Sequence, residues 1–252
     1  MSRILTALVL VPVAAYSVLF AHPVVFLAVV FFFAVCCFRE YAAITRSFAP
    51  LGYVAGALIL LAPPGDVGLL VFMTGLAAMC LPVFSPDPAS AVPRSAYLSL
   101  GIGYVFGAWK CGILLHDMNP HWLMFALVVN WAGDTGAYYV GRRFGRHKMA
   151  PAISPGKSWE GAAASVAAAV LFGAVYLPLA IKGTSVLAAI LISVGANVAG
   201  QVGDLAESAI KRSADVKDSG TMLPGHGGML DRLDSSLFAM PALYAMLRLG
   251  AK

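Results

Sequence analysis

Long apolar segments separated by short polar turns constrain this chain more than any other feature. A helix of about 20 apolar residues crosses a bilayer, and these segments are continuous, whereas membrane β-barrels show alternating segments of about ten residues. We therefore expect an all-α polytopic integral membrane protein with about nine transmembrane helices. The expected spans lie near residues 4–20, 24–38, 51–62, 67–84, 97–115, 122–140, 161–181, 185–203 and 235–249.

Composition agrees with a membrane class. Hydrophobic residues make up 60% of the 252 residues, against roughly 45–50% in soluble domains. The formal net charge of +5 could suggest a nucleic-acid partner in a soluble protein. In a membrane protein, basic residues mark cytoplasmic loops instead, so we expect the bilayer and no nucleic acid as the partner.

The distribution of basic residues gives an orientation. If the N-terminus is cytoplasmic and the spans alternate, 13 of the 17 Lys and Arg residues fall on the cytoplasmic side, as the positive-inside rule requires. The first apolar segment lacks small residues before a possible cleavage after Ala21, so we read it as an uncleaved helix. We expect a protein of the bacterial inner membrane whose active site faces the cytoplasm.

The chain divides at a proline-rich stretch, residues 85–94. Residues 1–95 would hold about four transmembrane helices. Residues 96–252 would form the catalytic region, with cytoplasmic polar loops at 141–160 and 204–234. The second of these loops concentrates charge in a chain that is only 12% charged, and we take it as the centre of the site.

One helical face would carry the first part of this centre. Asp204, Ser208 and Lys211 stand at i, i+4 and i+7, a spacing that places them on the same side of a helix. An acid, a hydroxyl and an amine near a membrane boundary can bind a metal and a phosphate together. The plainer alternative is an interfacial helix with solvated charges, but ionisable residues near membrane depth are usually functional.

A glycine-rich turn follows Lys217 and Asp218, and it includes Gly227 and Gly228. Glycines allow close approach of the backbone, and exposed N–H groups in such a turn can hold phosphate oxygens. His226 lies within the turn, where it would either contact phosphate or substrate or simply brace the loop.

Two further acids come next. Asp231 and Asp234 are three residues apart on either side of Arg232. Together with Asp204 they offer an oxygen-rich site suited to Mg²⁺. They could instead cap the last helix, because Asp is favoured near a helix N-terminus.

A second polar stretch lies upstream. Asp134 and Asn130 interrupt an apolar helix, which is costly without a partner or a cavity. Lys157 and Ser158 precede the seventh span, but Pro151 stands where a P-loop requires glycine. Asn197 and Gln201 would line the same pocket or hydrogen-bond between helices. Lys110, within the fifth span, has no evident partner in the sequence.

Taken in order, these residues resemble the signature of the phosphatidate cytidylyltransferases, also called CDP-diacylglycerol synthases. The resemblance rests on residues spread over 208–234 and on upstream motifs at 134–138 and 154–161. The matching positions of the C-terminal run are Ser208, Lys211, Arg212, Lys217, Asp218, Gly220, Leu223, Pro224, His226, Gly227, Gly228, Asp231, Arg232 and Asp234.

The resemblance implies that the protein catalyses a reaction in which CTP and phosphatidic acid give CDP-diacylglycerol and pyrophosphate. It also implies a nine-helix fold, a homodimer, and Mg²⁺ paired with a second cation such as K⁺. Asp204 and Asp231 correspond to that family's metal-binding acids.

The resemblance implies a role for each of these residues. Asp204, Asp231 and Asp234 are the expected metal ligands. The expected catalytic residues are Lys157, Ser208, Lys211, Arg212, Asp218, His226 and Arg232. The expected nucleotide- or cofactor-binding residues are Asp134, Ser158, Lys217, Gly227 and Gly228.

Three alternatives remain. The acceptor could be another lipid phosphate, since the motifs do not report the acyl groove. A CDP-alcohol phosphotransferase would require a D-G-x2-A-R pattern that is absent. An ion-coupled transporter could use Asp134, Asn130 and Asn197, but it would not explain a phosphate-binding turn beside three acids.

Overall fold

The computed structural model describes residues 12–222, 225 and 227–250, and these form a mainly helical protein. A helical segment at 12–19 comes first. The long helices that follow are α2 (Pro23–Thr45), α3 (Ala49–Leu61), α4 (Val67–Cys80), α5 (Pro88–Gly101), α6 (Ala108–Met118), α7 (Pro120–Phe144), α8 (Trp159–Ala180), α9 (Val186–Ser213) and α10 (Leu230–Gly250). The short η1 (Leu81–Phe84) extends α4, and the π-helical η2 (Ile102–Gly107) joins α5 to α6.

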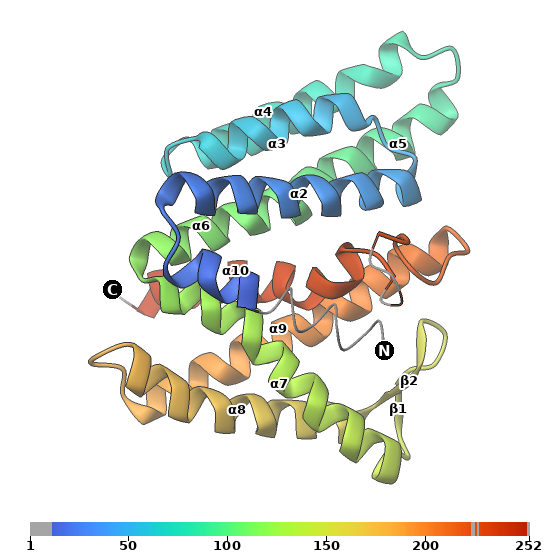
Figure 1. Cartoon of the computed structure of the whole chain (residues 1–252). Coiled ribbons are helices and arrows are strands. Elements are labelled where there is room, and N and C mark those ends of the chain that lie inside the picture. Colours follow the sequence, from blue (N-terminus) through green and yellow to red (C-terminus); the bar gives the residue numbers. More distant parts are fainter. Residues whose placement is uncertain (1–11, 223–224, 226, 251–252) are drawn as a thin grey trace.

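α10 occupies the middle of the molecule. In Figure 1 it runs between a group formed by α2 to α6 and a group formed by α7, α8 and α9. It packs against α9, α6, α7 and α2. The N-terminal end of α10 is therefore surrounded by elements from both halves of the chain.

The all-α membrane class is confirmed at the level of helix length and composition. Within the described residues, five helical segments are long and apolar enough to cross a bilayer: Pro23–Thr45, Val67–Phe84, Pro88–Met118, Trp159–Ala180 and Val186–Ser213. Large apolar side chains such as Phe72 on α4 and Leu179 on α8 are exposed, which suits a surface facing lipid.

The segment 141–160 is more ordered than the loop expected from the sequence. It contains an antiparallel hairpin of β1 (Lys148–Ala150) and β2 (Ser154–Ser158). The Glu160 carboxylate, just after β2, accepts hydrogen bonds from the backbone N–H groups of Arg146 and His147, just before β1. These bonds join the two ends of the hairpin. Strands this short carry no clear alternation, so the sequence pattern did not reveal them.

The segment 204–234 is likewise not a single loop. α9 continues to Ser213 and α10 begins at Leu230, so most of the expected site residues stand on helices. Helices hold side chains at fixed angles to one another, which makes this a better platform for a site than a free loop.

Lys110 has a clear structural role. Its side chain is buried, and Nζ donates to the carbonyl oxygens of Leu60 at 3.0 Å and Ala62 at 2.6 Å. These groups lie at the C-terminal end of α3, where the last carbonyls lack intrahelical partners. Lys110 therefore caps α3 from another helix.

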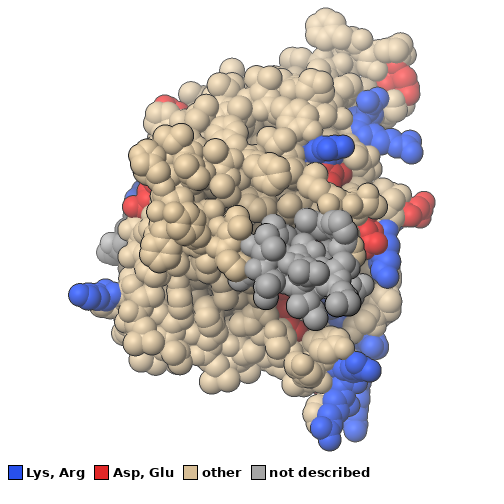
Figure 2. Space-filling model, in the orientation of Figure 1, with Lys and Arg blue, Asp and Glu red and all other residues tan. Residues whose placement is uncertain are grey.

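Charge is gathered at one end of the helices. On the face drawn in Figure 2, most visible Lys and Arg lie toward the right-hand edge, and the middle is almost uncharged. Figure 1 places the β1–β2 hairpin at that same end. The hydrogen bond from Arg94 Nε to the Arg46 carbonyl, at 2.7 Å, joins the start of α5 to the end of α2 there.

Candidate active site

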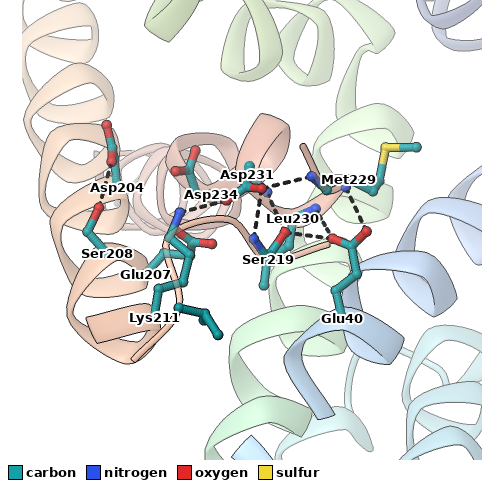
Figure 3. Close-up of polar contacts among 12 residues, drawn as sticks. Glu40, Asp204, Glu207, Ser208, Lys211, Ser219, Met229, Leu230, Asp231 and Asp234 are labelled. Carbon is teal, nitrogen blue, oxygen red and sulfur yellow. Dashed lines mark hydrogen bonds and ion pairs between the residues drawn. The ribbon is translucent and has the colours of Figure 1, made fainter. Parts of the chain in front are cut away.

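The expected helical face is present on α9. Ser208 Oγ donates to Asp204 Oδ1 at 3.4 Å, and Lys211 follows one turn further along. All three side chains line one cavity. The i, i+4, i+7 spacing therefore predicted their common orientation correctly (Figure 3).

Asp231 is held in the first turn of α10 by three donors. Lys211 Nζ lies 2.6 Å from Oδ1, and the N–H groups of Ser219 and Gly228 reach Oδ2 at 2.9 and 2.8 Å. Burial alone would raise the pKa of this carboxyl, but the Lys211 ammonium and the two N–H groups hold the pKa below its ordinary value. Asp231 is thus held as a charged carboxylate, which can bind a cation such as the Lys211 ammonium.

Sequence reasoning missed Glu207, which lies beside this pair. It is almost fully buried and forms an ion pair with Lys211. Its Oε1 atom finds no hydrogen-bond donor in the described part of the chain. Lys211 is therefore shared between two carboxylates, those of Glu207 and Asp231 (Figure 3).

Lys157 enters from the hairpin. Its Nζ atom lies 2.7 Å from Asp204 Oδ2, and both side chains are about one-third exposed, at 29% and 30%. The adjacent Ser158 is buried and accepts the Gly161 N–H at 3.2 Å. Ser158 is therefore the N-cap of α8, and this contact fixes the backbone beside Lys157.

Two cavities meet at the site. The first, of about 690 Å³, lies between the hairpin, α7, α8 and α9, and its lining includes Asp134, Lys157, Gln201 and Asp204. The second, of about 570 Å³, lies between α9 and α10. Its polar lining includes Ser208, Lys211, Arg212, Lys217, Asp218, Asp231, Arg232 and Asp234. Asp134, Asp204 and Ser235 line both cavities, so the two adjoin.

The second cavity also has an apolar wall. Phe33 of α2, Trp109 of α6, and Leu127 and Trp131 of α7 line it together with the charged residues. Such a pairing of apolar surface with a few polar groups is typical of a ligand site. It suits a molecule with one charged and one hydrocarbon part.

A polar network supports the first cavity. Asn197 Nδ2 donates to Ser165 Oγ at 3.1 Å and to Asn130 Oδ1 at 3.4 Å, and Gln201 Nε2 donates to Asn197 Oδ1 at 2.8 Å. A Cβ at Gly133 would collide with Asn197 and Ser165. Asn197 thus bonds between helices while Gln201 also lines the cavity, so both sequence interpretations describe part of this network.

The remaining expected residues lie around the second cavity with different partners. Arg212 Nε donates to the Ile153 carbonyl at 3.2 Å, which ties α9 to the hairpin. The Gly228 N–H is donated to Asp231, and is not free for phosphate while that bond holds. Gly227 adopts φ +82°, which favours glycine. His226 lies outside the described residues.

The acids suit a metal that also takes ligands from a substrate. Among the described residues, no three His, Cys, Asp or Glu side chains converge as a metal cage. Mg²⁺ is usually bound through one or two carboxylates plus water and substrate phosphates. Asp204 and Asp231, which both line the second cavity, fit that mode.

The sequence matches the model of the Cytidylyltransferase family over residues 1–250. The chain belongs to this family. The family resemblance inferred from the polar motifs is therefore confirmed.

Three curated relatives named phosphatidate cytidylyltransferase are similar to this chain. The chain is 47% identical to the Bacillus subtilis protein over 156 residues, covering 61% of this chain and 58% of that protein. It is 35% identical to a Staphylococcus epidermidis protein over 205 residues, covering 76% of each. It is 40% identical to the Haemophilus influenzae protein over 148 residues, covering 56% of this chain and 51% of that protein. The chain thus spans between about half and three-quarters of these relatives.

Proposed function

We propose that this protein transfers the cytidylyl group of CTP to phosphatidic acid, giving CDP-diacylglycerol and pyrophosphate for phospholipid biosynthesis. The observation that carries the proposal is the pair of adjoining cavities, which share Asp134 and Asp204 and both have basic side chains in their lining. Relatives named phosphatidate cytidylyltransferase support the same reaction.

The second cavity would take the lipid phosphate. Lys211, Arg212, Lys217 and Arg232 supply positive charge to its lining, and cations bind phosphate oxygens through charge-assisted hydrogen bonds. The glycerol and the first acyl carbons would lie along the apolar wall that includes Trp131. Asp218, Ser208 and the glycine turn with His226 would orient the headgroup.

The first cavity would take CTP. Lys157, Lys148 and Arg142 line it together with Asp134, Ser158 and Gln201. The basic side chains would neutralise the triphosphate, and the amide and carboxylate groups would bind the nucleoside. The α-phosphorus would then lie near the boundary between the cavities, where Lys157 meets Asp204.

The reaction joins a lipid phosphate oxygen to the α-phosphorus of CTP while the bond from the α-phosphorus to the bridging oxygen breaks. Pyrophosphate leaves with that bonding pair. A phosphate monoester has a second pKa of about 6, so its dianion is already a nucleophile near neutral pH. The protein's contribution is then positioning and charge neutralisation, as in other phosphoryl transfers.

Mg²⁺, with a second cation such as K⁺, is the proposed cofactor. Asp204 and Asp231 would hold it, with Asp234 directly bound or adjacent. When bound, such an ion neutralises developing charge on phosphate oxygens. Lys157 and Lys211, which pair with Asp204 and Asp231 here, would turn toward phosphate.

The proposed setting is a bacterial inner membrane, with nine spans, a cytoplasmic N-terminus and a homodimer. The gathering of basic side chains at the hairpin end of the helices supports a cytoplasmic site. CTP would enter from that side, and the lipid would enter sideways from the bilayer.

Mass spectrometry of the lipid product tests this proposal. Purified protein with CTP, Mg²⁺ and phosphatidic acid should form CDP-diacylglycerol, and ATP should not replace CTP. If a different lipid phosphate is cytidylylated and phosphatidic acid is not, the acceptor is that other lipid. Flux of a solute into liposomes without CTP consumption would support the transporter alternative.

A further inference from the structure

Glu40, near the C-terminal end of α2, is a buried acid that the proposed mechanism does not use. It is 6% exposed. Its carboxylate accepts the N–H groups of Met229 at 3.0 Å and Leu230 at 2.8 Å, and the Ser219 hydroxyl at 2.7 Å. Two of these donors begin α10 and the third lies in the loop before it (Figure 3).

These contacts make Glu40 a cap supplied to α10 by a different helix. The first N–H groups of a helix have no intrahelical partner, and negative charge is favoured at that end. Ser219 Oγ also accepts the Asp231 N–H at 3.3 Å, and the Asp231 carboxylate accepts the Ser219 N–H at 2.9 Å. Glu40 and Asp231 therefore hold the same serine from two sides.

The neighbouring glycines leave room for this carboxylate. A Cβ on Gly220 would lie 2.7 Å from Glu40 Oε1, and a Cβ on Gly228 would collide with Glu40 and with Ser219. The chain on both sides of the turn thus packs closely on Glu40. Any shift of Glu40 would have to be shared by Ser219 and by the start of α10.

We propose that Glu40 is a positioning residue, which sets Asp231 against Lys211 and Asp204 by fixing Ser219 and the first turn of α10. Glu40 lines neither of the two cavities described above, so it acts through other residues. We call the contacts of Glu40 with Ser219, Met229 and Leu230 the clamp. The expected effect on turnover rests on the proposed function, whereas the clamp does not.

Glu40→Gln tests the role with little change in shape. Both oxygens of Glu40 accept hydrogen bonds, so the glutamine amide would turn a donor toward at least one N–H or hydroxyl. We expect kcat to fall about 10- to 100-fold, as small misplacements in active sites do, with little change in KM for CTP or lipid. Ser219→Ala removes both hydrogen bonds of the serine hydroxyl but leaves the Met229 and Leu230 N–H groups bonded to Glu40, so it should lower kcat less.

The two substitutions should not be additive, because residues in one hydrogen-bond network are coupled. Lys110→Met is the matched control. It also removes a buried charge that binds backbone at a helix end, but that helix is α3. We expect it to lower the unfolding temperature and leave kcat unchanged. An equal kcat loss in Lys110→Met would overturn the proposal, because general destabilisation would then suffice.

Hydrogen–deuterium exchange of the full-length protein in detergent gives a readout independent of activity. Glu40→Gln and Ser219→Ala should speed exchange in peptides covering 217–232 and not at the end of α3, and Lys110→Met should do the reverse. Unchanged exchange over 217–232, or a uniform rise in all helices, would contradict the clamp. If the wild-type protein lacks turnover but shows this pattern, the proposed function fails while the clamp stands. Ser219→Ala keeps the test available if Glu40→Gln does not fold.

Discussion

Lys157 Nζ lies 2.7 Å from Asp204 Oδ2, so the β1–β2 hairpin reaches α9 at the boundary between the two cavities. This contact places a cation from one polar segment against an acid from the other, about 50 residues along the chain. In the proposed reaction, the CTP α-phosphate and the lipid phosphate meet at this boundary.

Replacement of Lys157 should therefore affect turnover far more than stability. We expect Lys157→Met to lower kcat/KM for CTP about 100-fold, the usual loss when a group stabilising transition-state charge is removed. A partly exposed ion pair contributes only about 0–1 kcal/mol to folding, so the unfolding temperature should change little. Steady-state kinetics and thermal unfolding check both statements. Lys182→Met, in the exposed turn after α8, is the control and should retain normal kinetics.

Asp231→Asn should abolish measurable turnover while the protein stays folded. The carboxylate bonds to Lys211 and to two backbone N–H groups, and an amide would remove its charge and one acceptor. We expect kcat to fall about 100-fold or more. Asp117→Asn, which changes an acid that is 65% exposed at the end of α6, is the matched control. Normal activity of Asp231→Asn would remove Asp231 from the site.

Trp131→Ala should weaken lipid binding selectively. Trp131 lines the apolar wall of the second cavity and not the first cavity. We expect KM for long-chain phosphatidic acid to rise about tenfold, equivalent to roughly 1.4 kcal/mol, with KM for CTP unchanged. A short-chain lipid should show a smaller rise. Trp159→Ala changes a tryptophan that is 61% exposed, and serves as the control. Equal increases in KM for CTP and for the lipid would contradict lipid binding along this apolar wall.

Gly228→Ala should destabilise the protein through the turn before α10. The new methyl would collide with Ser219 Oγ and with the Glu40 carboxylate, and overpacking of this kind costs about 1–3 kcal/mol. Thermal unfolding should show a midpoint lower by several degrees, since about 1 kcal/mol shifts it roughly 2–4 °C in a chain of this size. Gly75→Ala, where nothing lies within 4 Å, should leave the midpoint unchanged or raise it. Equal midpoints for the two variants would contradict the packing described around Glu40.

The sequence predicted the parts of this protein that follow a periodic pattern. Apolar runs located most of the helices, although α5 begins at Pro88 within the stretch expected to be a proline-rich loop. The spacing of Asp204, Ser208 and Lys211 identified their common face on α9. The all-α class and the family are confirmed, while the nine-span count and the site roles stay predictions. Patterns succeed here because one helix sets the relation between its own residues.

The sequence did not predict relations between distant elements. Glu40 is a single acid in an apolar helix, and its partners are backbone N–H groups of α10. Lys110 likewise bonds to carbonyls at the end of α3. Backbone groups carry no sequence signature, so such caps emerge only from the packing. Glu207 was not predicted as a site residue, because Asp204 and Lys211 already accounted for the polar face of that helix.

Pyrophosphate release by the purified, detergent-solubilised protein tests the central claim most directly. The account predicts release that requires CTP, phosphatidic acid and Mg²⁺ together, and that stops when ATP replaces CTP or when Asp231 is changed to Asn. Absence of release from wild-type protein shown to be folded, with all three components present, would contradict it.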